Sequence, residues 1–262
     1  MYKVANGNLL FHGCVPLNED GTFSSMNCLG TWHAGRDYLD FCDHIARRAW
    51  RVGDRDALDW MWYLWIGFNS PASGRLVRTF ERAYIADKST WVEPMDPYFT
   101  LTKSPSVCDD IMREFGVAPM ACSPTGHIIN GHIPVKSKKG ESPIKGGGKL
   151  IVIDGGFCRA YQPTTGIAGY TLVYDSRGLY IVAHEPFVSF EKAIRENMDI
   201  HSTTEVENIL ATKGQMRVSD CDKGVELREQ IRQLEMLIAA FECGLIKENN
   251  RYRMVKVPLN NR

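Results

Sequence analysis

Apolar residues in the first half of the chain recur mostly at helical spacing. Between Arg36 and Trp50, apolar side chains follow one another at steps of three and four residues: Tyr38, Phe41, Ile45 and Ala49. Such a stripe is typical of a helix with one buried face. Further helices are expected at about Asp56–Ile66, Leu76–Asp87 and Ser104–Gly116, the last opened by Ser104 as N-cap and Pro105 in the first turn.

Short runs rich in β-branched residues predict strands, most of them in the second half of the chain. The expected strands are Asn8–Phe11, His127–Asn130, Lys149–Ile153, Tyr170–Tyr174 and Leu179–Ala183. The polar turn before Gly178 makes the last two a hairpin. Loops are expected at Cys14–Gly30, Trp91–Lys103 and Lys136–Gly148. This mixture predicts an α/β (α+β mixed) fold.

A last helix is expected at about Val225–Cys243. Its apolar side chains alternate at steps of four and three residues: Leu227, Ile231, Leu234, Ile238 and Phe241. That stripe fits a helix packed on its own domain, and it also fits the seam of a dimer.

Composition narrows the functional classes. The 262 residues hold 31 Lys and Arg against 31 Asp and Glu, which leaves no net charge. Proteins that bind nucleic acid or anionic membranes carry a basic excess, so neither partner is expected. The most apolar run, Trp60–Phe68, is shorter than the roughly 20 residues that span a bilayer. It is expected to form a helix whose aromatic side chains pack in the core or between subunits, and neither a secretory signal nor a membrane span is expected.

The eight cysteines are scattered and never form a Cys-x-x-Cys pair. This spacing favours reduced thiols over a disulfide framework or a zinc site. A cytoplasmic protein is therefore expected.

Two histidines come where an expected strand gives way to a loop. His12 follows the apolar run Asn8–Phe11, and His132 follows His127–Asn130 after one glycine. Polar side chains at strand ends are how α/β sheets present ligands, and imidazole binds divalent metals. A single histidine of this kind is more often a hydrogen-bonded structural residue, so the pattern alone leaves both interpretations open.

Several stretches resemble motifs of the calcineurin-like metallophosphoesterases. Phe11-His12-Gly13, followed by a proline-containing loop, is similar to their fourth motif, and Gly131–Val135 is similar to their fifth. Lys149–Gly156 resembles the strand that comes next in phosphatases of that fold. More specifically, the chain resembles the C-terminal part of bacterial class III fructose-1,6-bisphosphatases over these stretches: Asn8–Gly21, Trp62–Trp65, Thr79–Arg82, Asn130–Lys136, Gly140–Lys145, Ile153–Phe157 and Tyr170–Gly178.

The resemblance implies the C-terminal half of a metallophosphoesterase β-sandwich, flanked by helices and carrying a helical insert. Residues 1–262 would form one incomplete domain. Its parts would be a strand and loop (1–21), the insert (31–117), strands with the second histidine (127–190) and a final helix (220–245). The family's first three metal motifs precede the fourth, whereas only eleven residues precede His12. The chain is therefore expected to be a fragment that is inactive without the missing N-terminal half.

The activity implied by the resemblance is hydrolysis of the 1-phosphate of fructose 1,6-bisphosphate, which gives fructose 6-phosphate in gluconeogenesis. The site would hold two Mn²⁺ (or Mg²⁺) ions. His12 and His132 would complete the shell of the second metal, and the missing half would supply most other ligands. No catalytic residue is singled out in this chain. The string Gly53–Asp56 imitates the second motif but follows His12, and it is expected to cap a helix.

Other polar residues have two possible roles each. Asp154 would orient a metal-binding histidine through its other ring nitrogen, or it is a turn residue that ends a strand. A group of cations would hold the phosphates of the substrate, or its lysines would belong to a solvated loop: Lys136, Lys138, Lys139, Lys145 and Arg159. The other histidines are expected to be structural.

Two further hypotheses remain at this point. One is another phosphoesterase of the same fold, such as a protein phosphatase or a dinucleoside polyphosphate hydrolase. The other is a catalytically silent interaction module that uses the C-terminal stripe and the aromatic helix as contact surfaces. An uncovered sheet edge and face would promote self-association, so a homo-oligomer is expected.

Overall fold

The computed structural model describes two compact units, Met1–Arg217 and Val218–Arg262. The described residues are 1–120, 123–156, 158, 161–166, 169–184, 189–196, 202–211 and 215–246. Each unit is considered by itself. The prediction of a mixed α/β fold is confirmed. The prediction of one incomplete domain over 1–262 stays a prediction.

The first unit is organised by a five-stranded sheet with the order β1-β2-β5-β7-β6. Its three central strands, β2 (Asn8–Phe11), β5 (His127–Asn130) and β7 (Leu150–Val152), run parallel. The edge strands β1 (Tyr2–Ala5) and β6 (Ile144–Lys145) are antiparallel to their neighbours. The expected central strands are confirmed, and their parallel pairing brings the ends of β2, β5 and β7 to one edge of the sheet.

A second, three-stranded sheet has the order β10-β9-β8. Strands β8 (Gly169–Asp175) and β9 (Gly178–His184) form the expected hairpin, and β10 (Ser202–Ala211) pairs with β9. Leu179 and Ile181 of β9 pack against Ile129 and Ile151 of the first sheet in one apolar cluster. The two sheets therefore face each other, which is the sandwich that the resemblance implied.

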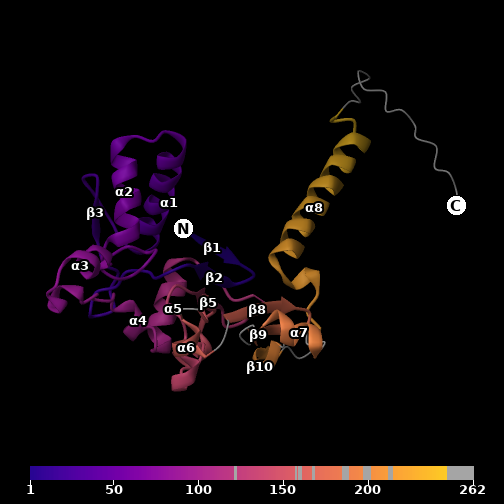
Figure 1. Cartoon of the computed structure of the whole chain (residues 1–262). Helices are drawn as coiled ribbons and strands as arrows, with labels where there is room; N and C mark the ends of the chain where they lie inside the picture. Colours follow the sequence, from indigo (N-terminus) through magenta and orange to yellow (C-terminus); the bar gives the residue numbers. More distant parts are fainter. Residues whose placement is uncertain are drawn as a thin grey trace. The chain divides into compact units, whose positions relative to one another are not determined.

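The main helices of the first unit lie between β2 and β5 along the chain (Figure 1). They are α1 (Gly35–Arg51), α2 (Arg55–Ile66), α3 (Thr79–Tyr84), α4 (Tyr98–Leu101) and α5 (Pro105–Glu114). Two short helices follow later, α6 (Gln162–Thr165) and α7 (Phe190–Arg195). Single 3₁₀ turns span Lys88–Trp91, Ser137–Lys139, Gly146–Gly148 and Val218–Asp220. The predicted cap is confirmed, since the Asp54 carboxylate accepts a hydrogen bond from the Ala57 amide at the start of α2.

The helix expected at Leu76–Asp87 is shorter than predicted. The amide of Leu76 donates to the carbonyl of Pro94, and Arg75 forms a bridge with Met95, so the chain is extended before α3. These non-local bonds compete with the helical ones and leave only Thr79–Tyr84 helical.

All three expected loops contain regular structure. The edge strand β6 (Ile144–Lys145) lies within Lys136–Gly148, and the other two loops each hold a further short element. The segment Cys14–Gly30 includes β3 (Met26–Cys28), which pairs with β4 (Thr31–His33) through a turn with positive φ at Leu29 and Gly30. The segment Trp91–Lys103 includes α4, whose first turn begins where the Asp96 carboxylate accepts a hydrogen bond from the Tyr98 amide. Both elements are too short for a periodic pattern to reveal them.

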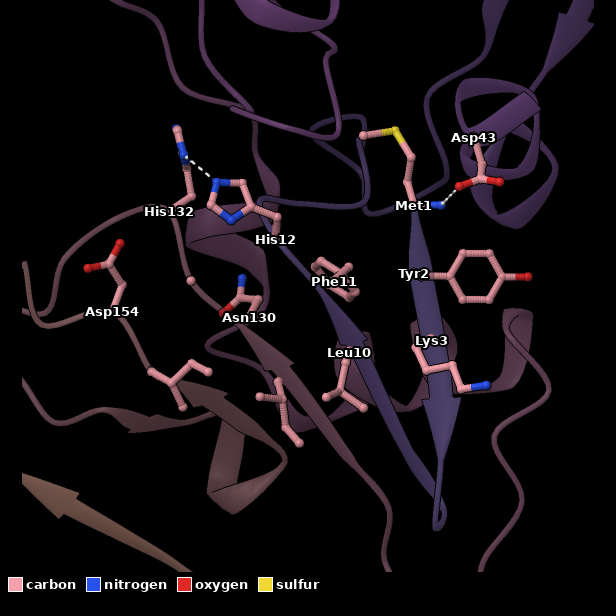
Figure 2. Close-up of a pocket in the computed structure, with 13 residues that line it drawn as sticks. Met1, Tyr2, Lys3, Leu10, Phe11, His12, Asp43, Asn130, His132 and Asp154 are labelled. Carbon is pink, nitrogen blue, oxygen red and sulfur yellow. Dashed lines mark hydrogen bonds and ion pairs between the residues drawn. The ribbon is translucent and has the colours of Figure 1, made fainter. Parts of the chain in front are cut away.

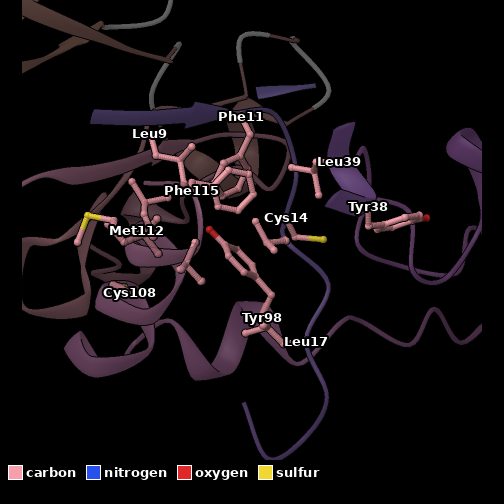
Figure 3. Close-up of a cluster of buried hydrophobic side chains, with 14 of the residues drawn as sticks. Leu9, Phe11, Cys14, Leu17, Tyr38, Leu39, Tyr98, Cys108, Met112 and Phe115 are labelled. Atoms are coloured by element: carbon pink, nitrogen blue, oxygen red, sulfur yellow. The ribbon is translucent and has the colours of Figure 1, made fainter. Parts of the chain in front are cut away.

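The main core lies between the first sheet and helices α1 and α5 (Figure 3). Leu9 and Phe11 of β2 meet Leu39 of α1, and Met112 and Phe115 come from α5 and its end. The ring of Tyr98 packs edge-on against Phe11, with ring centroids 5.9 Å apart. Burial of these side chains fixes the strand ends that carry the histidines.

The aromatic run on α2 is only partly a core feature. Trp60 packs on Phe41 of α1, as expected. Trp62 and Trp65 are 49% and 50% exposed, and both contact Phe80 of α3, so the prediction of core packing is wrong for them. At two and five residues after Trp60, they lie on other faces of the helix.

The second unit contains the expected C-terminal helix, α8 (Asp222–Glu242). Whether its apolar stripe packs on the chain's own domain or on a second copy stays a prediction. Within the described part of the chain, no helix is long and apolar enough to cross a membrane.

Candidate metal centre

Three polar side chains follow the three parallel strands at one edge of the first sheet (Figure 2). His12 comes directly after β2, His132 lies two residues after β5, and Asp154 lies two residues after β7. The register pairs Leu10 with Ile129 and Asn130 with Val152, so the three strands end level with one another. The topology thus brings together residues that lie up to 142 positions apart in the sequence.

His12 and His132 are in direct contact. His12 Nε2 lies 3.1 Å from His132 Nδ1, and the two rings are nearly perpendicular, at 72°. The backbone supports the contact, because the Gly131 amide donates to the carbonyl of His12 at 2.9 Å. One ring nitrogen of each predicted metal ligand therefore lies beside the other.

His132 holds an uncommon backbone conformation, with φ at +68°. The Ile133 amide donates to the Gly131 carbonyl across it at 2.8 Å, which closes a three-residue γ-turn. In this form of the turn the central residue is strained, and such strain is concentrated at functional sites. The turn aims the His132 ring back at His12.

Hydrogen bonds from Asn130 hold the two segments that carry the histidines together. Its buried Nδ2 donates to the Gly13 carbonyl and to the Tyr98 hydroxyl, each at 3.0 Å. Gly13 itself has no room for a side chain, since a Cβ atom there would lie 2.6 Å from the Pro71 carbonyl oxygen. The loop after His12 is thereby fixed on both sides.

The electrostatic environment favours the uncharged form of His132. Burial lowers the pKa of His132, and the nearby charges of His12 and Arg75 lower it further, while Asp154 acts in the opposite direction. A neutral imidazole has a lone pair free to bind a metal ion. Its other nitrogen, Nε2, is buried and has no hydrogen-bond partner among the described residues.

Asp154 lies beside the pair without bonding to it. Its Oδ1 accepts a hydrogen bond from the Gly156 amide at 2.8 Å, which is a turn interaction. In the described part of the chain no hydrogen bond joins it to either histidine. Its role in orienting a histidine therefore stays a prediction.

The histidines open onto a cavity of about 640 Å³. Apolar side chains from the second face of the sheet, Leu10, Ile129 and Ile153, line it together with Asn130 and Asp154. Figure 2 shows both histidine rings at one end of this cavity. The space is large enough for a metabolite of several hundred daltons.

The two histidines are placed as two of the ligands in the coordination shell of a metal ion would be. Two ligands about 2.0–2.2 Å from one ion are separated by roughly 2.9–3.4 Å, and the observed nitrogens are 3.1 Å apart. The described residues hold no group of three or more His, Cys, Asp or Glu side chains that would complete a site. His12 and His132 can therefore hold an ion only together with further ligands.

Comparison with known proteins decides the family. The family described as Firmicute fructose-1,6-bisphosphatase matches residues 1–243. The chain belongs to this family. It is 52% identical to the "Fructose-1,6-bisphosphatase class 3" of Clostridium novyi (strain NT) over 257 residues, and 50% identical to that of Bacteroides fragilis (strain YCH46) over 254 residues. Both alignments cover 95% of this chain, and 38% and 37% of the relatives.

The chain therefore spans less than two fifths of the length of these curated relatives. No solved structure matches it significantly. The family membership predicted from the histidine motifs is confirmed, and the short coverage is consistent with the fragment that the sequence predicted.

The cations expected to contact the phosphates of a substrate are not all equivalent. Lys136 and Lys145 line a second cavity, which also contacts Asn130 and Gly131. Lys138 donates to the Pro163 carbonyl at 3.0 Å, and Lys139 is exposed. Arg159 lies outside the described residues.

The glycines of the same loop have a packing role. Gly146 is buried at φ +56°, and a Cβ atom there would lie 2.8 Å from Cys108 Sγ and 2.9 Å from the Thr102 carbonyl oxygen. A Cβ atom at Gly147 would likewise come too close to Pro105. Close approach to the start of α5 thus accounts for these glycines without any phosphate.

The histidines expected to be structural include a buried one. The His127 ring lies 2.8 Å from Asn8 Oδ1 through its Nδ1, and burial lowers its pKa to about 4. His33, the last residue of β4, pairs with Asp37, and His44 pairs with the Asp40 carbonyl at an exposed position of α1. His201 lies outside the described residues.

Sequence reasoning missed two residues near the centre. Asn130 was part of a motif, but its amide bonds depend on Gly13 and Tyr98, which are remote in the sequence. Arg75 acts electrostatically on His132, although it follows a turn segment with no motif. Neither side chain carries a local signal that would have identified it.

Proposed function

We propose that this chain is part of a metal-dependent phosphatase that removes the 1-phosphate of fructose 1,6-bisphosphate and yields fructose 6-phosphate in gluconeogenesis. On its own the chain is inactive in this proposal, because its described residues supply only two of the metal ligands. The observation that carries this proposal is the 3.1 Å contact between His12 Nε2 and His132 Nδ1, in a chain about half identical to curated fructose-1,6-bisphosphatases.

His12 and His132 would hold one metal ion through these two nitrogens. When bound, a pair of divalent ions provides a Lewis acid for the phosphate and a hydroxide at neutral pH. The tie from Asn130 to the Gly13 carbonyl keeps the two imidazoles in register, so that the site needs little reorganisation. Asp154 would add negative charge near His132 and is proposed to orient it.

Of the two metals expected, Mn²⁺ fits the nitrogen pair better than Mg²⁺. Both ions favour oxygen ligands, but magnesium demands a near-ideal octahedron and keeps its waters, whereas Mn²⁺ is a first-row transition metal that binds mixed nitrogen and oxygen sites. The proposal is therefore a site for two Mn²⁺ ions, with the remaining ligands from residues outside this chain.

The substrate is held by cations on the basic loop in this proposal. Lys136 and Lys145 have the strongest support, because they line a cavity that adjoins Gly131. Lys138, Lys139 and Arg159 remain proposed contacts to a substrate phosphate.

A homo-oligomer in the cytoplasm is proposed as the native state. Six cysteines described in the structure are free thiols, which suits a reducing compartment: Cys14, Cys28, Cys42, Cys108, Cys158 and Cys243. The exposed aromatic side chains Trp62, Trp65 and Phe80 form a contiguous apolar cluster, which suits contact with another chain.

The deciding experiment is phosphate release from fructose 1,6-bisphosphate in the presence of Mn²⁺. The chain would be assayed alone and after mixing with the complementary part of the Clostridium novyi relative. We expect no release by the chain alone and release on mixing, which is lost in a His132→Asn chain. Release by the chain alone would contradict the proposal that its metal site is incomplete.

Other phosphoesterase activities are tested with the same mixture. A phosphoserine peptide and a dinucleoside polyphosphate would replace the sugar bisphosphate at equal concentration. Faster turnover of either one would favour the corresponding phosphoesterase over the sugar phosphatase. No turnover of any substrate by a mixture that binds Mn²⁺ would favour an interaction module.

A further inference from the structure

A second cavity lies behind the turn that carries His132. It measures about 220 Å³ and is enclosed by the end of α4, by the segment 131–136 and by strands β6 and β7. Gly131, Ile133 and Pro134 line this cavity, whereas His132 between them lines the larger one. The two cavities thus share the wall formed by the γ-turn.

Three lysines border the smaller cavity: Lys103, Lys136 and Lys145. They come from two distant parts of the chain, since Lys103 follows α4 and the others belong to the loop after β5. Lys103 carries no motif and was not among the cations singled out in the sequence. The fold therefore assembles this cluster.

Only one of the three lysines is neutralised by a partner. Lys145 Nζ lies 2.6 Å from Glu141 Oε1, and Glu141 Oε2 accepts a hydrogen bond from the Lys136 amide at 2.8 Å. Over the residues that the structure describes, no carboxylate lies within 4.0 Å of the Lys103 or Lys136 ammonium group. Three lysines against one glutamate leave two positive charges at the mouth of the cavity.

The lining of the cavity mixes polar and apolar groups. Thr102 and Asn130 line it beside Tyr98, Leu150 and Val152, and all five side chains are buried. Low-dielectric walls strengthen the field of nearby charges and draw in an anion. The volume suits a small ligand, because cavities for drug-sized molecules begin at about 300 Å³.

We propose that Lys103, Lys136 and Lys145 form a binding site for one phosphate group, carried either by the substrate or by a separate small phosphorylated compound. A bound phosphate would also pull the segment 131–136 toward α4, and this segment sets the position of His132. The site thereby links anion binding to the geometry of the histidine pair. The phosphate site stands without the proposed phosphatase activity, and only the choice between the two ligand sources depends on it.

Binding is tested first with inorganic phosphate and the metal-free chain, by isothermal titration calorimetry at low ionic strength. We expect saturable binding with a millimolar Kd, about tenfold weaker in Lys103→Met because one unpaired charge is lost. Glu141→Gln should bind several-fold more tightly, because it releases Lys145. The opposite directions of these two changes would not arise from general destabilisation.

Lys88→Met serves as the matched control, because Lys88 is an exposed lysine that does not line the cavity. Its phosphate affinity should equal that of the parent chain. Equal weakening in Lys88→Met and Lys103→Met would mean that phosphate responds to the overall charge of the chain, and it would overturn the site. Absence of saturable binding in the parent chain would overturn it as well.

The source of the phosphate is distinguished by turnover, in the mixture that restores activity. If the substrate's second phosphate occupies the cavity, Lys103→Met should raise KM about tenfold and leave kcat unchanged. If a separate compound occupies it, KM should stay constant, and the effect of added phosphate on the rate should disappear. A variant that changes neither KM nor the response to phosphate would overturn the proposal. A mixture without activity would contradict the proposed phosphatase and leave the calorimetric result intact.

Discussion

Asn130 donates a hydrogen bond from its side chain to the backbone carbonyl of Gly13, at 3.0 Å. Gly13 follows the first histidine and Asn130 precedes the second by two positions. The bond therefore clamps the ends of two neighbouring strands at the point where each delivers an imidazole. It works alongside the bond from the Gly131 amide to the His12 carbonyl, so a side chain and a backbone group secure the same junction.

Loss of this clamp should cost stability. Asn130→Ala removes two buried hydrogen bonds and leaves the Gly13 carbonyl without this donor, and we expect a loss of about 2–3 kcal/mol in the free energy of unfolding. Urea denaturation followed by tryptophan fluorescence measures it. Tyr98→Phe, which removes only the hydroxyl partner, should cost about 1 kcal/mol or less. Equal losses in the two variants would mean that the Gly13 bond contributes little.

The glycine loop offers a matched pair of substitutions. Gly146 and Gly140 both have positive φ, at +56° and +74°, but only Gly146 is surrounded by other atoms. Alanine at either position introduces backbone strain of about 1–2 kcal/mol. Gly146→Ala adds a clash with Cys108 and Thr102, so it should be the more destabilising of the two by at least about 1 kcal/mol. Thermal or urea unfolding of both variants checks the difference.

Asp96 should make the protein more stable in mild acid. Burial raises the pKa of Asp96 to about 6, although amide hydrogen bonds from Tyr98 and Leu17 act against the rise. The ordinary pKa of an aspartate is 3.8. Between pH 6 and pH 3.8, the folded protein therefore binds a proton at Asp96 more tightly than the unfolded chain does. Relative to Asp96→Asn, the parent chain should therefore gain up to about 3 kcal/mol as the pH falls from 7 to 4. Urea titrations across that range measure the gain.

His127 should act in the opposite direction over nearly the same range. Burial lowers the pKa of His127 from 6.5 to about 4, so in that interval the unfolded chain binds the proton more tightly. Relative to His127→Gln, the parent chain should lose roughly 3 kcal/mol as the pH falls from 7 to 4. The two contributions largely offset each other in the parent chain. If both variants showed the same slope of stability against pH as the parent, burial would not perturb these groups.

Metal binding by the histidine pair is open to direct measurement. We expect weak Mn²⁺ binding by the chain, observed by electron paramagnetic resonance, with a Kd raised at least tenfold by His12→Gln or by His132→Asn. Asparagine is chosen at position 132 because it tolerates the positive φ there. His44→Gln is the control, since His44 is exposed on α1 and its ring bonds to the Asp40 carbonyl. Equal binding by all three variants would place the ion elsewhere.

The sequence predicts the central strands and the long helices well, because their periodic patterns are local. One hairpin was missed although its signal was present. Asn6-Gly7 connects β1 and β2 with positive φ at both residues, and Asn-Gly between two strands is the strongest short-range indication of such a turn. The strand β1 itself was too short and too mixed in polarity to predict.

The site could be predicted only in part. The two strand-end histidines were visible, but their contact depends on the parallel pairing of β2 with β5, which no local pattern specifies. The burial of Asp96 and the meeting of Lys103 with Lys136 likewise depend on contacts between remote segments. The strained γ-turn at His132 was hidden for another reason, since nothing in Gly-His-Ile-Pro distinguishes it from an ordinary turn.

Strands β2 and β5 are immediate neighbours in the sheet, yet residues 12–126 separate them along the chain. Pairing such strands requires closing a loop of more than a hundred residues, which makes it an entropically unfavourable and late step in folding. The histidine contact would then form only after α1 and α5 have packed. Changes in length within this long crossover, around the exposed α3 for instance, would alter the rate of assembly while leaving the spacing of the two imidazoles untouched.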